Sequence, residues 1–585
     1  MMDVRFIGGA VIWFVSFSGL MLFLNLKLKV KSYLTPGLAA CLFLVAEYCA
    51  GILNIMIPVT YALLISGCGC WVIILAERKK IFASSDSRLN FIPLCLILII
   101  YIAGLIRFEG MALTNYDDFS HWGLIVKSMV FNNRLPVSQD SYIAFKSYPP
   151  GSACFIFSVV KVLGFNEGRV LFANYLLKVC LLSSLFSIYE IATTRLSKIL
   201  AAVVSTTAVL VYSLYGSLFA LGVDSLLACA GIFCVLTVYL NRESIIPNLW
   251  IFAISASACV LIKNSGIFFY AIGVIFVLAM VIRERKFTKS NLRWFIWLLI
   301  PALMIWIWQS HVSLVFPNGL NAKHSLSYEY EKKIFSKKSS EDLKDEFGIF
   351  IRCATSWTLN RSLLLWVGLI LFTGILLGVN HSDKALRKKV LSYVIFFLLF
   401  SLVYQIGILW TYMFSMSHSE VLSNDGSNYS RYNSTFVLFL AAFALVYVFS
   451  VLQYIRVKAL VALCTACTCC VLWFSVEDKT SFSILNSARI SNSAARYEVK
   501  LQAEALLNAP RGDAEKTYAI RANTNKTVYS GYLKHLLRYL TLTNANSVYD
   551  HMEDEETWQE YWETEATEDY CIDLISMRLL KRKKR

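Results

Sequence analysis

Long apolar runs alternate with short polar segments along most of the chain, up to about residue 476. A helix needs about 20 apolar residues to cross a bilayer, and the pattern predicts about fourteen such spans. They are 5–25, 33–52, 55–76, 92–107, 168–190, 196–217, 219–240, 248–263, 265–284, 293–310, 362–380, 388–414, 432–456 and 457–476. Residues 1–476 are therefore predicted to form an all-α polytopic membrane domain.

The topology depends on whether the segment 151–164 spans the membrane. The segment is doubtful as a span, because it is short, contains a lysine and follows two prolines. If residues 108–167 all stay on one side, with 151–164 in the interface, the basic clusters fall together on the other side. These clusters are "KLKVK", "ERKK", "TTRLSK", "RERKFTK", "RKK" and "IRVK". Basic residues favour the cytoplasmic side. We therefore expect an outside N-terminus, with the loops 108–167, 311–361 and 415–431 on the extracytoplasmic face.

The tail, residues 477–585, has a different composition and is expected on the same face. "KTYAIRAN" and "TVYSGYL" favour strands, whereas "KHLLRYLTL" and "ETWQEYWETE" favour helices. The tail is of ordinary domain size, since domains usually have about 50 to 250 residues. It is predicted to be a small extracytoplasmic α+β domain.

Composition agrees with a membrane protein and argues against a nucleic-acid partner. The 585 residues are 57% hydrophobic and 16% charged, and the mean hydropathy is +0.58. The net charge of +16 resides mostly in the short loops, where topology explains it. The 16 cysteines lie mainly inside apolar runs, including "CTACTCC" at 464–470, and are interpreted as helix-packing residues. No disulfide framework and no nucleic-acid binding are expected.

The stretch "TNYDDFSHWG", residues 114–123, begins a predicted interfacial helix from Asp118 to about residue 132. The apolar positions Phe119, Trp122, Val126 and Met129 fall three or four residues apart, on one face of a helix. Trp122 is a natural anchor at the membrane surface. The helix would lie in the interface and carry its polar residues at that depth.

Two adjacent carboxylates and a histidine stand at the start of this helix. Asp117 falls at the cap or first turn, and His121 lies one turn further on. Aspartate is a favoured helix cap, but one aspartate is enough for capping. The second acid and the nearby histidine at the bilayer surface favour a functional site.

The same loop continues with "NNRLP" (132–136) and "SYPPGSA" (147–153). In this order the motifs resemble the first large external loop of membrane glycosyltransferases of the GT-C superfamily. The likeness covers roughly residues 100–440 as architecture and this loop as motif. It implies transfer of a sugar from a polyprenyl-phosphate carrier to an acceptor outside the cytoplasm. Many members have Glu as the second acid, where this chain has Asp118, which leaves the sugar open.

The resemblance implies roles for residues of the outer face. The acceptor loses a proton as it attacks, so a carboxylate is needed as general base, and Asp117 or Asp118 takes that role. The leaving phosphate needs fixed donors or cations. The candidate substrate-binding residues are His121, Lys127, Tyr148, Asp224, Lys263, Lys323, His324 and Arg431.

The residues themselves also allow plainer roles. Asp224 could cap a helix, Lys263 could reach from a helix end to the lipid surface, and Arg431 could anchor a span. No metal or other cofactor is assigned, although two acids could bind a divalent ion. The acceptor is expected to be a cell-envelope glycan, lipid or polymer.

Three other functions would have different sequence features. A lipid-linked glycan polymerase or ligase usually centres on arginines and a histidine in a late loop, whereas here the acids come early. A transporter of polysaccharide or lipid would place ionisable residues at mid-membrane and often show inverted repeats, and no repeat is visible. A purely structural anchor does not need so many spans.

Overall fold

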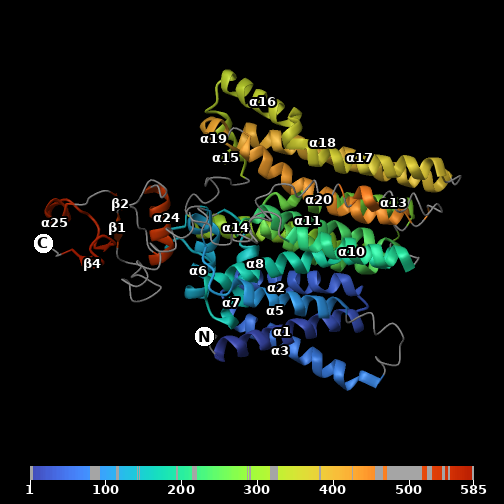
Figure 1. The fold of residues 1–585 in the computed structure, drawn as a ribbon, viewed down its shortest axis with the longest axis horizontal. Helices are drawn as coiled ribbons and strands as arrows, with labels where there is room; N and C mark the ends of the chain where they lie inside the picture. The colour runs from blue at the N-terminus through green and yellow to red at the C-terminus, as the bar shows by residue number, and fades with distance from the viewer. Residues whose placement is uncertain are drawn as a thin grey trace.

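Apolar helices lying side by side form the body of the computed structural model (Figure 1). The structure describes residues 4–582, apart from the segments and single residues given next. These are 80–91, 114–116, 193–194, 214–220, 286–287, 289–290, 317–326, 381–383, 424–425, 455–464, 471–516, 523–529, 543–546 and 551–553, with Ser141, Ala144, Lys146, Gln453 and Cys469. The candidates Lys323 and His324, and most of the predicted span 457–476, lie outside the described residues.

Ten helical segments of the described chain are long and apolar enough to cross a bilayer. Three more predicted spans, 92–107, 196–217 and 248–263, coincide with shorter apolar helices. The bundle helices are α1 (Val4–Leu26), α2 (Thr35–Ile52), α3 (Met56–Ala76), α5 (Ile92–Phe108), α8 (Glu167–Leu182), α9 (Ser187–Ile191), α10 (Arg195–Ser213), α11 (Val223–Leu240), α12 (Leu249–Ile262), α13 (Gly266–Arg283), α14 (Ile300–Val315), α17 (Trp357–Asn380), α18 (Lys384–Trp410) and α20 (Ser427–Leu452). The protein is thus a polytopic membrane protein, and the prediction of about fourteen spans is confirmed in part.

Burial separates central from peripheral helices. The most apolar windows of α8 and α11 are 89% buried and that of α20 is 94% buried, against 22% for α3 and 17% for α18. A helix that is apolar all round can be buried on every side or face lipid. The central helices α8, α11 and α20 therefore form the core, and α3 and α18 present their apolar surface outward.

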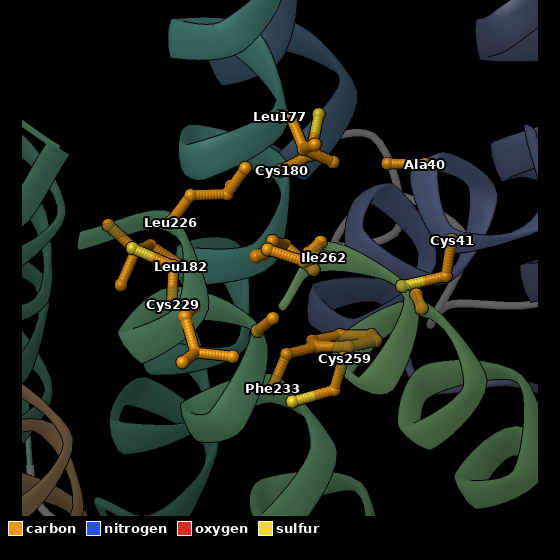
Figure 2. Close-up of a cluster of buried hydrophobic side chains, with 14 of the residues drawn as sticks. Ala40, Cys41, Leu177, Cys180, Leu182, Leu226, Cys229, Phe233, Cys259 and Ile262 are labelled. Carbon is orange, nitrogen blue, oxygen red and sulfur yellow. The ribbon is translucent and has the colours of Figure 1, made fainter. Parts of the chain in front are cut away.

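Thiols fill gaps between the central helices (Figure 2). Cys41, Cys180, Cys229 and Cys259 come from α2, α8, α11 and α12 and pack beside Phe233. All four are buried free cysteines. Cysteine behaves here as a small apolar residue, as the sequence predicted for the cysteines inside apolar runs.

The helices of the polar loops gather at one end of the bundle, together with the tail (Figure 1). We call it the loop end: the end at which α5 finishes and α8 begins. The loop helices are α6 (Gly123–Asn132), α7 (Gly151–Leu163), α15 (Tyr328–Phe335), α16 (Ser340–Thr355) and α19 (His418–Ser423). A π-helical turn, Asp118–Trp122, leads directly into α6.

The described part of the tail contains a four-stranded sheet of order β2-β1-β3-β4. Its elements are β1 (Tyr518–Ala522), α24 (Ser530–Thr541), β2 (Ser547–Asp550), α25 (Glu555–Thr564), β3 (Tyr570–Asp573) and β4 (Arg578–Lys581). The strands β2, β1 and β3 are parallel, and β4 is antiparallel to β3. The predicted strand in "KTYAIRAN" and both predicted helices of the tail are confirmed.

The prediction of a strand in "TVYSGYL" (527–533) was wrong for residues 530–533, because α24 begins at Ser530; residues 527–529 lie outside the described residues. Tyrosine and valine favour strands locally, but α24 packs its leucines on the sheet. Leu536 and Leu540 lie in the same core cluster as Ile520 and Ile572 of β1 and β3. This tertiary contact outweighs the local preference.

Candidate active site

The loop between α5 and α8 starts and ends at the same place. Leu113 N donates to Glu167 Oε2 at 2.8 Å, and Arg169 forms an ion pair with Glu109 at 3.1 Å. A Cβ atom on Gly168 would lie 2.0 Å from the Phe108 carbonyl oxygen, so only glycine permits this approach. Residues 109–166 therefore stay at the loop end, as the sequence predicted.

Helix α7 is buried in protein instead of lying in the lipid interface, which corrects the expectation for 151–164. It packs on α1, α2, α6 and α8, and nearly all its side chains are buried. A Cβ atom on Gly151 would lie 2.5 Å from the Leu261 carbonyl oxygen at the end of α12. The glycine of "YPPG" thus lets α7 approach α12, and Tyr148 of the same motif lies close to Asp224.

The two adjacent aspartates lie in opposite environments. Asp117 is exposed and its side chain makes no capping hydrogen bond, so the capping interpretation does not describe it. Asp118 is fully buried, and its Oδ1 accepts a hydrogen bond from Leu221 N at 2.8 Å. Asp118 therefore ties the π-helical turn to the segment that enters α11, whereas the Asp117 carboxylate is accessible.

Asp224 joins two cations from distant parts of the chain. Lys263 Nζ is hydrogen-bonded to Asp224 Oδ1, and Arg431 Nε lies 3.3 Å from Asp224 Oδ2. Asp224 is on the first turn of α11, Lys263 follows α12 directly, and Arg431 is on the first turns of α20. The three residues therefore form one charged cluster, a contact that capping, reaching to lipid or anchoring does not require.

Arg431 also connects this cluster to the early loop. Asp117 lies within electrostatic range of the Arg431 guanidinium. The Arg431 side chain is 47% exposed, so part of the guanidinium is open to a ligand. An accessible carboxylate and an accessible cation therefore lie within electrostatic range of each other at the loop end, although they are far apart in the sequence.

Aromatic side chains border the cluster. The Tyr432 ring lies 5.1 Å from both Lys263 Nζ and the centre of the Arg431 guanidinium. Tyr148 is close to Tyr432, Arg431 and Asp224, and burial, followed by the neighbouring Tyr432, raises the pKa of Tyr148. Tyr148 thus keeps its proton and can act as a hydrogen-bond donor.

Tyr432 was not among the residues predicted from the sequence, although it directly follows Arg431 in "NYSRYNS" (428–434). Tyr432 lies next to Arg431, and aromatic rings commonly stack against guanidinium groups. Glu420 of α19 was also missed, and its charge reaches Tyr148. No periodic or motif signal in the sequence indicates Glu420, because only the fold brings α19 to the loop 108–167.

His121 lies in an aromatic group, away from the charged cluster's ion pairs. Its ring centre is 4.2 Å from that of Trp122, 5.2 Å from Phe145 and 5.0 Å from Tyr148. His121 is buried. Its ring contact helps to fix the position of Tyr148. This role does not require His121 to contact a ligand.

Lys127 does not face the cluster, which corrects its assignment as a substrate-binding residue. Its Nζ donates to the carbonyl oxygens of Tyr539 at 2.8 Å and Leu540 at 3.1 Å. Lys127 is buried, with 1% of its surface exposed. The contact is with the last turn of α24, so Lys127 joins the early loop to the tail.

The long loop 311–361 supplies α15 and α16, which are fixed to the end of α18. Lys338 Nζ donates to Glu346 Oε2 at 2.8 Å and to the Tyr412 and Met413 carbonyl oxygens at 2.8 and 2.9 Å. Its partner Glu346 is fully buried. A buried, fully hydrogen-bonded cation of this kind gives the two loop helices a defined place.

Among the described residues, no group of three or more His, Cys, Asp or Glu side chains is arranged to hold a metal ion. A small pocket does lie beside the cluster. It is lined by Pro149, Val260, Leu261, Asn264, Ile305, Trp308 and Gln309. Pro149 and Asn264 are the direct sequence neighbours of Tyr148 and Lys263, so the pocket borders the site.

Comparison with known proteins gives one structural likeness. No family model matches the chain, and no curated protein matches it. The fold is similar to that in the "Crystal Structure of ArnT from Cupriavidus metallidurans bound to Undecaprenyl phosphate". The TM-score is 0.45 at 11% sequence identity, over 83% of this chain and 92% of that chain. A likeness of this extent assigns neither an activity nor a substrate.

Proposed function

We propose that the protein is a membrane glycosyltransferase that moves a sugar from a polyprenyl-phosphate carrier to an acceptor hydroxyl or amide. The observation that carries the proposal is that the exposed Asp117 lies within electrostatic range of the half-exposed Arg431 and its ion pair with Asp224 at the loop end. A carboxylate that can take a proton and a cation that can hold a phosphate are the minimum equipment for this reaction. The lipid bilayer is the expected surrounding and the source of the donor.

The proposed chemistry uses the chain's own groups. Asp117 accepts the proton of the acceptor as the acceptor atom forms its bond to the anomeric carbon. The bond between that carbon and the phosphate oxygen breaks, and its electron pair leaves with the phosphate. Arg431 and Lys263 stabilise the growing negative charge, and Asp224 keeps the two cations together. Phosphate is already a good leaving group, so no strong general acid is needed.

The depth of the site suits a lipid-linked donor. Asp224, Lys263 and Arg431 stand at the ends of apolar helices, where the phosphate of a membrane-embedded carrier would lie. We propose that this end faces the extracytoplasmic side of the cell membrane, and that the acceptor is a cell-envelope glycan, lipid or polymer. The topology argument from the basic loops supports that orientation.

Asp117→Asn and Asp118→Asn distinguish the two aspartates. Membranes with wild type or either variant, at matched protein levels, receive a panel of radiolabelled polyprenyl-phosphate sugars. Wild type should consume one donor, and Asp117→Asn should lower its transfer by roughly 10²- to 10⁴-fold, the usual contribution of a general base. Asp118→Asn should lower the transfer far less, because the amide oxygen of the new side chain can still accept a hydrogen bond from Leu221 N.

Two outcomes would count against the proposal. If Asp117→Asn keeps full activity while wild type consumes a donor, Asp117 is not the base. If wild type consumes no donor although acceptor membranes are supplied, the transporter alternative is favoured.

A further inference from the structure

The tail covers the turn that follows the proposed base. Helix α24 packs on the π-helical turn Asp118–Trp122 and on α6, and Figure 1 shows α24 lying next to α6. The Phe119 ring of the turn lies 5.1 Å from the Tyr539 ring of α24, nearly edge-on. The contact joins two segments that are separated in the sequence by most of the membrane domain, from α6 to α20.

Lys127 is the polar part of this contact. The last carbonyl groups of a helix have no partner within the helix, and a cation at this end also meets the negative end of the helix dipole. Lys127 Nζ supplies both the missing hydrogen-bond donor and the positive charge, through its bonds to the Tyr539 and Leu540 carbonyl oxygens. It also lies 4.6 Å over the Tyr539 ring. A buried ammonium group with these contacts fixes the position of α24 relative to α6.

The opposite side of the π-helical turn is held as well. Asp118 binds Leu221 N ahead of α11, and Trp122 stacks on Tyr148 at 5.5 Å between ring centres. Asp117 immediately precedes this turn. The place of Asp117, within electrostatic range of Arg431, therefore depends on a segment held between the membrane domain and the tail. π-helical turns are rare and are frequent at functional sites.

We propose that α24 positions the general base and that Lys127 is the positioning residue that fastens it. Docking of α24 through Lys127 and Tyr539 holds the π-helical turn, and thereby sets the Asp117 carboxylate opposite Arg431. The inference rests on the proposed function. It gives the tail a role in the transfer step in addition to any role in binding the acceptor.

The buried position of Lys127 separates this role from direct contact with substrate. The side chain is 1% exposed, and its ammonium already donates to two carbonyl oxygens. A group that acts through Asp117 should affect turnover more than donor binding, whereas a phosphate ligand should affect donor binding first.

Three variants of the full chain test the inference. They are Lys127→Met, Lys127→Arg and, as a matched control, Lys581→Met at an exposed lysine on β4 of the tail. Each is assayed for kcat and KM with the donor that wild type uses, and for hydrogen exchange of α24 and of the turn. Lys127→Met should release α24, raise exchange in both segments and lower kcat roughly tenfold to a hundredfold, with KM for the donor little changed. Lys127→Arg can still donate to the carbonyls and should restore most of kcat, and Lys581→Met should resemble wild type.

Specific results would overturn the inference. In one, α24 exchanges freely in Lys127→Met but kcat is unchanged, so docking does not position the base. In another, α24 stays protected in Lys127→Met and Lys127→Arg while KM for the donor rises in both, so Lys127 contacts substrate. Absence of turnover by wild type would instead contradict the proposed function, and the exchange measurement would still report whether Lys127 fastens α24.

Discussion

Two neighbouring aspartates show how much a single residue's surroundings decide. Asp117 and Asp118 have the same side chain and nearly the same place in the sequence, yet one is exposed and the other fully buried. The buried carboxylate accepts from a backbone N–H, as buried charges must find a partner. The exposed carboxylate remains available for proton transfer.

At the residue scale, Arg431→Gln tests the proposed phosphate contact. The amide keeps a polar side chain but lacks the charge, so kcat/KM for the lipid-linked donor should fall by roughly 10²- to 10³-fold, as for loss of one electrostatic stabiliser. Arg352→Gln is the matched control, because Arg352 is an exposed arginine on α16. Equal kcat/KM values for the two variants would contradict the role of Arg431.

Close helix packing at glycine decides the placement of elements at the loop end. Gly168 and Gly151 let α8 and α7 approach the carbonyl oxygens of Phe108 and Leu261. These approaches close the loop 109–166 on itself and bring its "YPPG" segment to α12. The paired cluster of Asp224 and Lys263 then lies next to Tyr148.

At the element scale, Gly151→Ala should destabilise the protein. The new Cβ atom would lie 2.5 Å from the Leu261 carbonyl oxygen, and such overpacking costs about 1–3 kcal/mol. The melting temperature in detergent should fall by several degrees, roughly as that cost predicts. Gly69→Ala is the control, since nothing lies within 4 Å of its new Cβ atom. An unchanged melting temperature for Gly151→Ala would show that α7 can shift without cost.

The molecule as a whole places its charged site at one end of an apolar bundle. The core helices α8, α11 and α20 are buried along most of their length, and α3 and α18 face outward. Loop helices and tail gather at the loop end (Figure 1). This arrangement suits a reaction between a substrate anchored in lipid and one outside it, because both can reach the same end.

At the scale of the molecule, cysteine labelling tests the proposed orientation. Ser265→Cys introduces an exposed thiol at the loop end, and Lys388→Cys introduces one near the start of α18 at the other end. A membrane-impermeant maleimide should modify position 265 in intact cells and position 388 only after permeabilisation. Mass spectrometry at the introduced sites separates them from the native cysteines. The opposite pattern would place the loop end in the cytoplasm and contradict an extracytoplasmic site.

Local patterns in the sequence predicted most of the helices of the bundle. Runs of apolar residues predicted the helices of the bundle, since a span needs only length and hydrophobicity. Charge asymmetry predicted that residues 108–167 stay on one side, and the contacts around Glu167 and Gly168 show that the two ends of this segment lie together. Asp117 and Tyr148 were predicted from the motifs of the loop 108–167, Asp224 and Arg431 from the family resemblance, and Lys263 from its place at a helix end.

Contacts between distant segments decided the rest, and no local pattern encodes them. Phe119, Val126 and Met129 predicted a helix face in the lipid interface, but α24 and α7 cover this helix, and its apolar and polar sides are both buried. Lys127 therefore donates its hydrogen bonds to α24. Part of "TVYSGYL" is helical, because packing outweighs local propensity.

The sequence by itself determined a multi-helix membrane protein with a polar loop region, and it supplied the residue types that the proposed transfer would use. Only the tertiary structure decided which aspartate is accessible, that Asp224 pairs with both Lys263 and Arg431, and that Tyr432 and the tail adjoin the site. The physical reason is the distance along the chain over which each effect acts. Hydrophobicity and helix periodicity act over one segment, whereas burial and ion pairing depend on segments that only folding brings together.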